Sequence, residues 1–152
     1  CAEMCLALGM SPQQILQNAA RITQTPHRMQ VTNCGFYVVD DGYNASLSGV
    51  ESSCKTLSKF GGKKCAVAQG IVEGGRQSRQ LNARCGKMLG ETFDEVVVVG
   101  PNRHALEEGL LATNTLVLHA NSLEEATEIV RKNLSHGDIL YYQNDIPDLP
   151  VT

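Results

Sequence analysis

Hydrophobic residues follow two alternating patterns along most of this chain. Short apolar runs rich in strand-forming residues predict strands, the clearest of which occupy residues 36–39, 65–68, 95–99, 115–119 and 138–142. Between these runs, apolar residues recur every three or four positions, which predicts helices that begin near Ser46, Gln77, His104 and Ser122. A further short strand is expected just after Met29. The chain therefore alternates strand and helix from Met29 onward.

This alternation predicts the fold class. Continuous apolar strands separated by amphipathic helices are typical of a mostly parallel sheet covered on both faces. We expect an α/β fold, a Rossmann-like three-layer sandwich. Ligands bind such sheets beyond the carboxyl ends of the strands. The loops to inspect are therefore residues 40–46, 69–76, 101–104 and 143–148.

The first 25 residues follow a different pattern. Residues 1–8 resemble the closing turns of a helix that Gly9 can end, and Ser11, Pro12 and Gln14 form a start signal for a second helix reaching about Ile22. Residues 23–26 have no periodicity and contain a proline, which predicts a linker. We expect a piece cut from a longer protein, with one domain ending within residues 1–25 and another spanning residues 26–152.

Composition and charge narrow the function classes. The 152 residues are 42% hydrophobic and 5% aromatic, with 13 Lys and Arg against 16 Asp and Glu, a net charge of −3. A chain of this size can bury a core of its own without a disulfide or metal. The acidic excess argues against nucleic-acid binding. No apolar run is long enough to span a membrane and no signal peptide opens the chain, so we expect a cytoplasmic protein.

Cysteines and histidines show no metal-binding spacing. The six cysteines, at positions 1, 5, 34, 54, 65 and 85, form no C-x-x-C pair, and the four histidines are scattered. Buried free thiols explain the cysteines best, with a metal site or a reactive thiol as alternatives. No metal ligands are therefore assigned within this chain.

The glycine-bearing segments do not match known nucleotide-binding loops. Residues 70–75, Gly-Ile-Val-Glu-Gly-Gly, lack the G-x-G-x-x-G spacing, and no acidic residue ends the next predicted strand. Residues 61–64, Gly-Gly-Lys-Lys, precede a strand and have no Ser or Thr after the lysine, so they form no P-loop. The sequence has no site that could hold an ATP triphosphate alone.

Four segments carry a family resemblance when taken in order. Pro26-His27-Arg28-Met29 precedes a strand that ends in Asp41-Gly42-Tyr43-Asn44-Ala45, residues 70–75 precede Gln77, Asn82 and Gly86, and residues 137–142 precede Asn144-Asp145-Ile146-Pro147-Asp148. Together these segments resemble the Mur ligase family. The form D-x-Y-N-A looks most like members that add D-alanyl-D-alanine to a UDP-N-acetylmuramoyl tripeptide. The resemblance also implies that the first helices close a central ATPase domain and that residues 26–152 form the C-terminal, substrate-binding domain.

The resemblance implies an activity. ATP would phosphorylate the carboxylate of a UDP-muramoyl peptide, and an incoming amino acid or dipeptide would attack the acyl phosphate to form an amide bond. ATP and Mg²⁺ would be held mainly by the missing central domain, so this chain alone would be inactive. Its partners would be these substrates and the missing N-terminal and central domains.

The resemblance also implies roles for single residues. Arg28 would be catalytic, reaching the terminal phosphate of the nucleotide, and His27 and Asp41 would bind the nucleotide with it. The incoming amine would contact five residues: Tyr43, Asn44, Ser46, Asn144 and Asp145.

Other readings of these residues stay open. Arg28 could pair with a surface carboxylate, Asp41 could cap the following turn, and Glu73 could shape its loop in preference to a direct catalytic role. The chain also departs from the family pattern, because Ser46-Leu47 replaces the usual proline and Tyr142-Gln143-Asn144 replaces K-G-S. The alternatives are a related ligase with another acid and amine, either folylpolyglutamate synthase-like or cofactor-modifying, and a non-catalytic Rossmann-like nucleotide-binding module.

Overall fold

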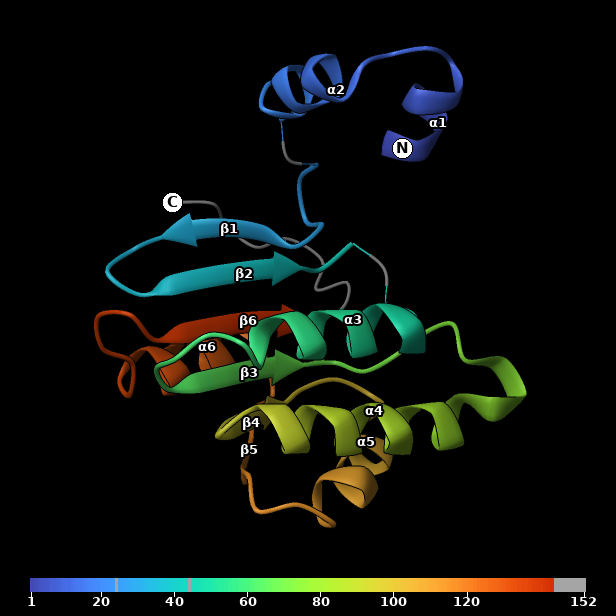
Figure 1. Cartoon of the computed structure of the whole chain (residues 1–152). Coiled ribbons are helices and arrows are strands. Elements are labelled where there is room, and N and C mark those ends of the chain that lie inside the picture. Colours follow the sequence, from blue (N-terminus) through green and yellow to red (C-terminus); the bar gives the residue numbers. More distant parts are fainter. Residues whose placement is uncertain (24, 44, 144–152) are drawn as a thin grey trace.

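A six-stranded sheet forms the centre of the molecule. The computed structural model describes residues 1–152 except 24, 44 and 144–152. The strand order is β1-β2-β6-β3-β4-β5, with β1 antiparallel to β2 and all other neighbours parallel (Figure 1). The strands are β1 (Gln30–Asn33), β2 (Tyr37–Asp41), β3 (Lys64–Ala68), β4 (Glu95–Val98), β5 (Leu116–His119) and β6 (Ile139–Gln143).

Helices cover both faces of this sheet. One face carries α3 (Leu47–Leu57), α4 (Ser78–Thr92) and α5 (Arg103–Leu110), and the other carries α6 (Leu123–Arg131) (Figure 1). A short 3₁₀ helix, η1 (Gly75–Gln77), precedes α4. The predicted α/β three-layer sandwich with a mostly parallel sheet is confirmed.

The two faces of the sheet have separate cores. Ala66, Val96 and Tyr141 pack against α3, α4 and α5, whereas Val67 and Val97 pack against α6, as the alternation of side chains along a strand requires. Tyr141 also stacks on Phe93, with ring centroids 5.3 Å apart. Because both faces are covered, every residue of β4 and β6 is buried, which explains why residues 96–98 and 139–142 are apolar.

The last strand lies in the middle of the sheet. β6 lies between β2 and β3, so that Gln143 is paired in register with both Asp41 and Ala68. The carboxyl ends of three strands that are far apart in the sequence therefore meet at one edge. The loops that follow β2 and β3 begin at this edge, one on each side of β6.

Helices α4 and α5 lie in very close contact. A Cβ atom at Gly86 would overlap the carbonyl oxygen of Leu106, and one at Gly109 would overlap that of Ala83. Glycine is therefore needed on both sides of this helix pair. Helix α4 continues to Thr92, one turn beyond the Leu89 that ends its predicted apolar pattern, and α5 packs along it.

The N-terminal segment forms two short helices, α1 (Ala2–Ala7) and α2 (Pro12–Ala19). The predicted start signal is confirmed, because Ser11 Oγ accepts a hydrogen bond from Gln14 N at 3.2 Å and Gln14 Oε1 accepts one from Ser11 N at 2.9 Å. Helix α2 ends at Ala19, earlier than the expected Ile22. Neither helix buries a side chain, and both lie apart from the helices that cover the sheet (Figure 1). The proposed domain boundary near residue 25 stays a prediction.

The cysteines divide into two groups. Cys54, Cys65 and Cys85 are buried free thiols, as predicted, and burial raises the pKa of Cys65 and of Cys85 to about 12. The prediction of burial is wrong for Cys1 and Cys34, which are exposed, because each lies in a segment with no helix packed over it. Within the described residues, no helix is long and apolar enough to cross a membrane.

Candidate functional site

The segment around Arg28 is fastened to the end of β2. His27 Nδ1 lies 2.8 Å from Asp40 Oδ2, His27 O accepts a hydrogen bond from Tyr43 N at 3.0 Å, and Asp41 Oδ1 accepts one from Met29 N at 3.2 Å. His27 and Met29 both have positive φ angles, 57° and 49°. Such angles are uncommon outside glycine, so the surrounding hydrogen bonds must hold the backbone in this form. The position of Arg28 is thus set from both sides.

Asp41 is the centre of a small hydrogen-bonded network. Its Oδ2 accepts hydrogen bonds from Ser53 Oγ at 2.8 Å and from the Tyr141 hydroxyl at 3.1 Å, in addition to the bond from Met29 N to Oδ1. Burial and the charge of Asp41 raise the pKa of Tyr141 well above its ordinary value, so this hydroxyl stays a donor. Asp41 therefore joins the segment before β1, helix α3 and strand β6 at the edge of the sheet. It is the neighbouring Asp40 that closes the turn, by accepting from Gly42 N at 3.0 Å.

The Arg28 guanidinium is stacked on an aromatic ring. Its central carbon lies 4.1 Å from the centroid of the Tyr43 ring, a cation–π contact. Arg28 forms no salt bridge with any residue that the structure describes. The alternative reading of Arg28 as one half of a surface ion pair is therefore not supported among those residues. As far as the described part of the chain goes, the hydrogen-bond donors of the guanidinium are available to a ligand.

Helix α3 begins beside Arg28. Ser46 is its N-cap residue, with extended φ and ψ angles of −111° and 158°, and its Oγ accepts a hydrogen bond from Gly49 N at 3.2 Å. This cap satisfies one of the backbone N–H groups in the first turn of the helix. The first turn of α3 contains no acidic residue, so the positive end of the helix dipole is uncompensated by its own side chains.

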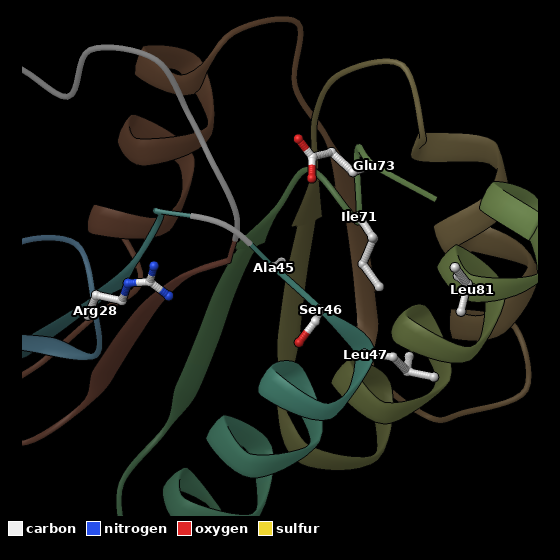
Figure 2. Close-up of a pocket in the computed structure, with 7 residues that line it drawn as sticks. All are labelled: Arg28, Ala45, Ser46, Leu47, Ile71, Glu73 and Leu81. Atoms are coloured by element: carbon white, nitrogen blue, oxygen red, sulfur yellow. The ribbon is translucent and has the colours of Figure 1, made fainter. Parts of the chain in front are cut away.

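A cavity of about 410 Å³ opens between Arg28, the start of α3 and the loop after β3. Its other lining residues are Ala45, Ser46, Leu47, Ile71, Glu73 and Leu81 (Figure 2). A second cavity of about 290 Å³ shares Arg28, Ala45 and Ser46 with the first and extends to Asp41 and Ser53. Both cavities, together called the hollow, lie at the carboxyl edge of the sheet, where ligands bind in this class of fold.

Two fully buried amides hold the loop after β3. Gln143 Oε1 accepts a hydrogen bond from Gly70 N at 2.9 Å, and Asn82 Oδ1 accepts one from Ile71 N at 2.6 Å. Asn82 Nδ2 also donates to Ile71 O at 3.0 Å. Gly70 has φ of +83° and no room for a Cβ atom next to Asn82, so only glycine fits. The loop that carries Glu73 is therefore anchored from inside the molecule.

The structure brings together only some of the residues singled out from the sequence. Arg28, Asp41 and Ser46 line the hollow, and Tyr43 lies under Arg28. His27 lies next to Arg28 but pairs with Asp40. Asn44, Asn144 and Asp145 lie outside the described residues.

Three residues were missed as contributors to this site. Asp40 fastens His27, and Asn82 and Gln143 anchor the loop after β3. Adjacent carboxylates at the end of a strand were a usable signal for Asp40. The strand-end position of Gln143 was a usable signal, but no sequence pattern paired it with Gly70, which is 73 positions away.

The chemistry available here is anion binding, with two carboxylates nearby, Glu73 in the larger cavity and Asp41 in the smaller one. A free guanidinium and the start of a helix both favour phosphate or carboxylate groups. Within the described residues, no group of three or more His, Cys, Asp or Glu side chains could hold a metal ion. The described residues therefore suit a ligand that carries a negative charge.

The sequence and the fold both match known proteins. Residues 27–142 match the family described as "Mur ligase, glutamate ligase domain". The MurF ligase of Thermotoga maritima, solved in complex with ADP, superposes with a TM-score of 0.80 at 24% identity, over 93% of this chain and 32% of that one. A MurF of Acinetobacter baumannii gives 0.76 at 23% identity, over 93% and 32%.

A third similar structure has another activity in its name. The bifunctional folylpolyglutamate synthase/dihydrofolate synthase of Yersinia pestis, complexed with AMPPNP and a Mn ion, gives a TM-score of 0.67 at 17% identity, over 90% of this chain and 32% of that one. At these identities the likeness is one of fold. In each case the chain spans about a third of the protein it resembles.

Proposed function

Because the chain belongs to the Mur ligase family, through its glutamate ligase domain, we propose that it is the C-terminal domain of an ATP-dependent amide-bond ligase of peptidoglycan precursor synthesis. The longer protein would join a UDP-muramoyl peptide to an incoming amino acid or dipeptide of the D-alanyl-D-alanine type. The chain spans about a third of similar ligases, which supports the further proposal that N-terminal and central domains complete the cytoplasmic enzyme.

One observation carries this proposal. The Arg28 guanidinium is held between two fixed neighbours, lies on the Tyr43 ring and has no carboxylate partner among the described residues. A cation kept free at a cavity mouth suits the charge that develops as a phosphoryl group is transferred and then released. Arg28 is therefore proposed as the catalytic residue that reaches the terminal phosphate.

The nucleotide would also contact the residues around Arg28. His27, 47% exposed at its side chain, lies on the outer side of the segment, and Asp41 lines the smaller cavity. Asp41 already accepts hydrogen bonds from Ser53, Tyr141 and Met29. It would therefore hold these residues in place as well as contact the nucleotide. ATP and Mg²⁺ would be held mainly by the central domain.

The incoming amine would enter the larger cavity. Ser46 lines it at the start of α3, and Tyr43 supports Arg28 at its mouth. Asn44, Asn144 and Asp145 are proposed to complete this contact set. Closure of the domain on its partner would exclude water, which would otherwise hydrolyse the acyl phosphate.

A second candidate is a ligase of the same family with another acid and amine. Two observations favour keeping it: the fold likeness to the folylpolyglutamate synthase of Yersinia pestis, and the replacement of K-G-S by Tyr142-Gln143-Asn144. Gln143 fills the space beside Gly70, which a glycine at position 143 would leave open. These differences fall on the side where the amine would bind, so they bear on substrate choice more than on ATP use.

The test is a ligation assay of the full-length protein in which the release of phosphate is measured. The acids are UDP-muramoyl peptides and a reduced folate, and the amines are D-alanyl-D-alanine, single amino acids and glutamate. We expect release that requires ATP, a UDP-muramoyl tripeptide and D-alanyl-D-alanine, and a loss of about two orders of magnitude in Arg28→Ala. Release only with folate and glutamate would favour the second candidate. No release with any pair, together with NAD or mononucleotide binding by this chain alone, would favour a nucleotide-binding module.

A further inference from the structure

The larger cavity is lined by two charged groups of opposite sign. Arg28 and Glu73 lie on either side of the segment that carries Ala45 and Ser46 (Figure 2). The remaining lining residues are uncharged, and three of them, Leu47, Ile71 and Leu81, form an apolar wall. A ligand in this cavity therefore meets a cation at one side, an anion at the other and a hydrocarbon surface between them.

Glu73 is the carboxylate left available at this cavity. Its side chain makes no hydrogen bond or ion pair with any described residue. The two nearby aspartates are already used, since Asp40 accepts from His27 and Gly42, and Asp41 accepts from three donors. Among the described residues around the cavity, Glu73 alone can receive a positively charged group without breaking an existing contact.

Two buried polar side chains hold the loop that carries Glu73 in place. Asn82 and Gln143 are both fully buried. The Asn82 amide hydrogen-bonds to the backbone of Ile71, and the Gln143 amide hydrogen-bonds to the backbone of Gly70. A buried amide is costly unless its hydrogen bonds are made, so this arrangement fixes the loop two residues before Glu73. The carboxylate is therefore presented from an anchored base, as a recognition residue requires.

We propose that Glu73 binds the ammonium group of the incoming amine and so determines which amines the enzyme accepts. This inference rests on the proposed function. An amino acid or dipeptide in neutral solution carries an ammonium group, which matches the available carboxylate of Glu73. The apolar wall beside Glu73 suits a short hydrocarbon side chain on the same ligand. The role assigned to Glu73 is binding, with no covalent step.

The experiment compares two variants of the full-length enzyme, Glu73→Gln and Glu128→Gln. Glu128 is an exposed carboxylate on α6, on the opposite face of the sheet, and serves as the matched control. For Glu73→Gln we expect KM for D-alanyl-D-alanine to rise roughly tenfold, with KM for ATP and for the UDP-muramoyl tripeptide unchanged. Glu73→Asp should recover part of the loss, because it restores the charge at a shorter reach. Glu128→Gln should match the unmodified enzyme.

A second readout isolates the ammonium group. Propionyl-D-alanine is D-alanyl-D-alanine without its amino group, so it can inhibit by occupying the same site. Its inhibition constant should be the same in the unmodified enzyme and in Glu73→Gln, whereas binding of the dipeptide weakens. Equal weakening of both ligands would overturn the assignment, because it would mean that Glu73 shapes the cavity and does not recognise the ammonium.

The outcomes separate this inference from the function on which it rests. If the unmodified enzyme ligates D-alanyl-D-alanine and Glu73→Gln behaves like Glu128→Gln, the role of Glu73 is overturned and the ligase proposal stands. If the unmodified enzyme ligates no amine, both proposals fall.

Discussion

At the scale of single residues, Asp41 shows how one carboxylate can serve both structure and ligand binding. Its three donors come from the segment before β1, from α3 and from β6, so it holds three elements to the edge at which the cavities open. Hydrogen bonds from three separate parts of the chain fix this carboxylate in place. The same geometry that limits its freedom also presents it to the smaller cavity.

We predict that Asp41→Asn destabilises this chain by about 1–3 kcal/mol, because its amide NH₂ cannot accept from both Ser53 and Tyr141. Urea unfolding of the chain measures the change. Tyr141→Phe removes only one donor, so it should lower the free energy of unfolding by less than Asp41→Asn does. The loss in the variant that carries both substitutions should be smaller than the sum of the two single losses. An unfolding midpoint that is unchanged in Asp41→Asn would contradict the structural role.

Local residue chemistry could be predicted from the sequence, and the Asp41 network could not. The start signal at Ser11 forms as expected, and Ser46 and Ser122 also cap their helices, because each cap depends on a residue three positions away. Tyr141, by contrast, lies 100 positions from Asp41. A contact of that span is decided by strand order, which no local pattern contains.

At the scale of elements, the α4–α5 pair depends on two glycines. The helices approach so closely that a methyl group at Gly109 would overlap the backbone of α4 at Ala83, and one at Gly86 would overlap that of α5 at Leu106. Backbone atoms cannot move aside as a flexible side chain can. The glycine noted at position 86 as part of the family pattern therefore has a packing reason.

We predict that Gly109→Ala destabilises the chain by roughly 1–3 kcal/mol or more, through overpacking against α4. Gly61→Ala is the matched control, because a Cβ atom there meets nothing within 4 Å. Thermal unfolding followed by circular dichroism compares the two variants. Equal melting temperatures for Gly109→Ala and Gly61→Ala would show that the helices can separate without cost.

Element types could be predicted well, and their order in space could not. The apolar runs at 65–68 and 95–99 became β3 and β4 with nearly the expected bounds, since each is covered on both faces. The insertion of β6 between β2 and β3 is a property of the whole chain. That insertion brings Gln143 to Gly70, so the anchored loop of the candidate site was also beyond local patterns.

At the scale of the whole molecule, buried ionisable groups set the alkaline limit of stability. Burial raises the pKa of Cys65 and Cys85 from 9.0 to about 12, and that of Tyr141 above its ordinary 10.0. Above pH 9 the unfolded chain loses protons that the folded chain keeps, which favours unfolding. These groups therefore contribute stability that is complete below pH 9 and is lost as the pH rises toward 12.

We predict that the free energy of unfolding falls by about 1 kcal/mol per pH unit for each thiol once the pH passes 9. Urea unfolding at a series of pH values gives the slope. Cys85→Ala should remove the contribution of one thiol from that slope, whatever its effect on stability at neutral pH. A slope that is the same with and without the Cys85 thiol would contradict the assignment.

The first 25 residues should add nothing to the stability of the rest. Helices α1 and α2 bury no side chain, and Met4, Leu8, Leu16 and Ile22 are between 70% and 81% exposed. We predict that a chain starting at residue 26 unfolds at the same urea concentration as residues 1–152, measured by fluorescence or circular dichroism. A shift of the midpoint to lower urea would show that these helices support the sheet domain.

The two left-handed residues on either side of Arg28 have a mechanical consequence. Because hydrogen bonds join His27 and Met29 to the end of β2, Arg28 moves as one rigid unit with the sheet. Any swivel of the domain must then take place upstream of Pro26. In the proposed ligase, one rigid-body movement of the domain would bring both Arg28 and the amine cavity to the acyl phosphate. Stabilisation of the phosphate and delivery of the amine would then occur in the same step of closure.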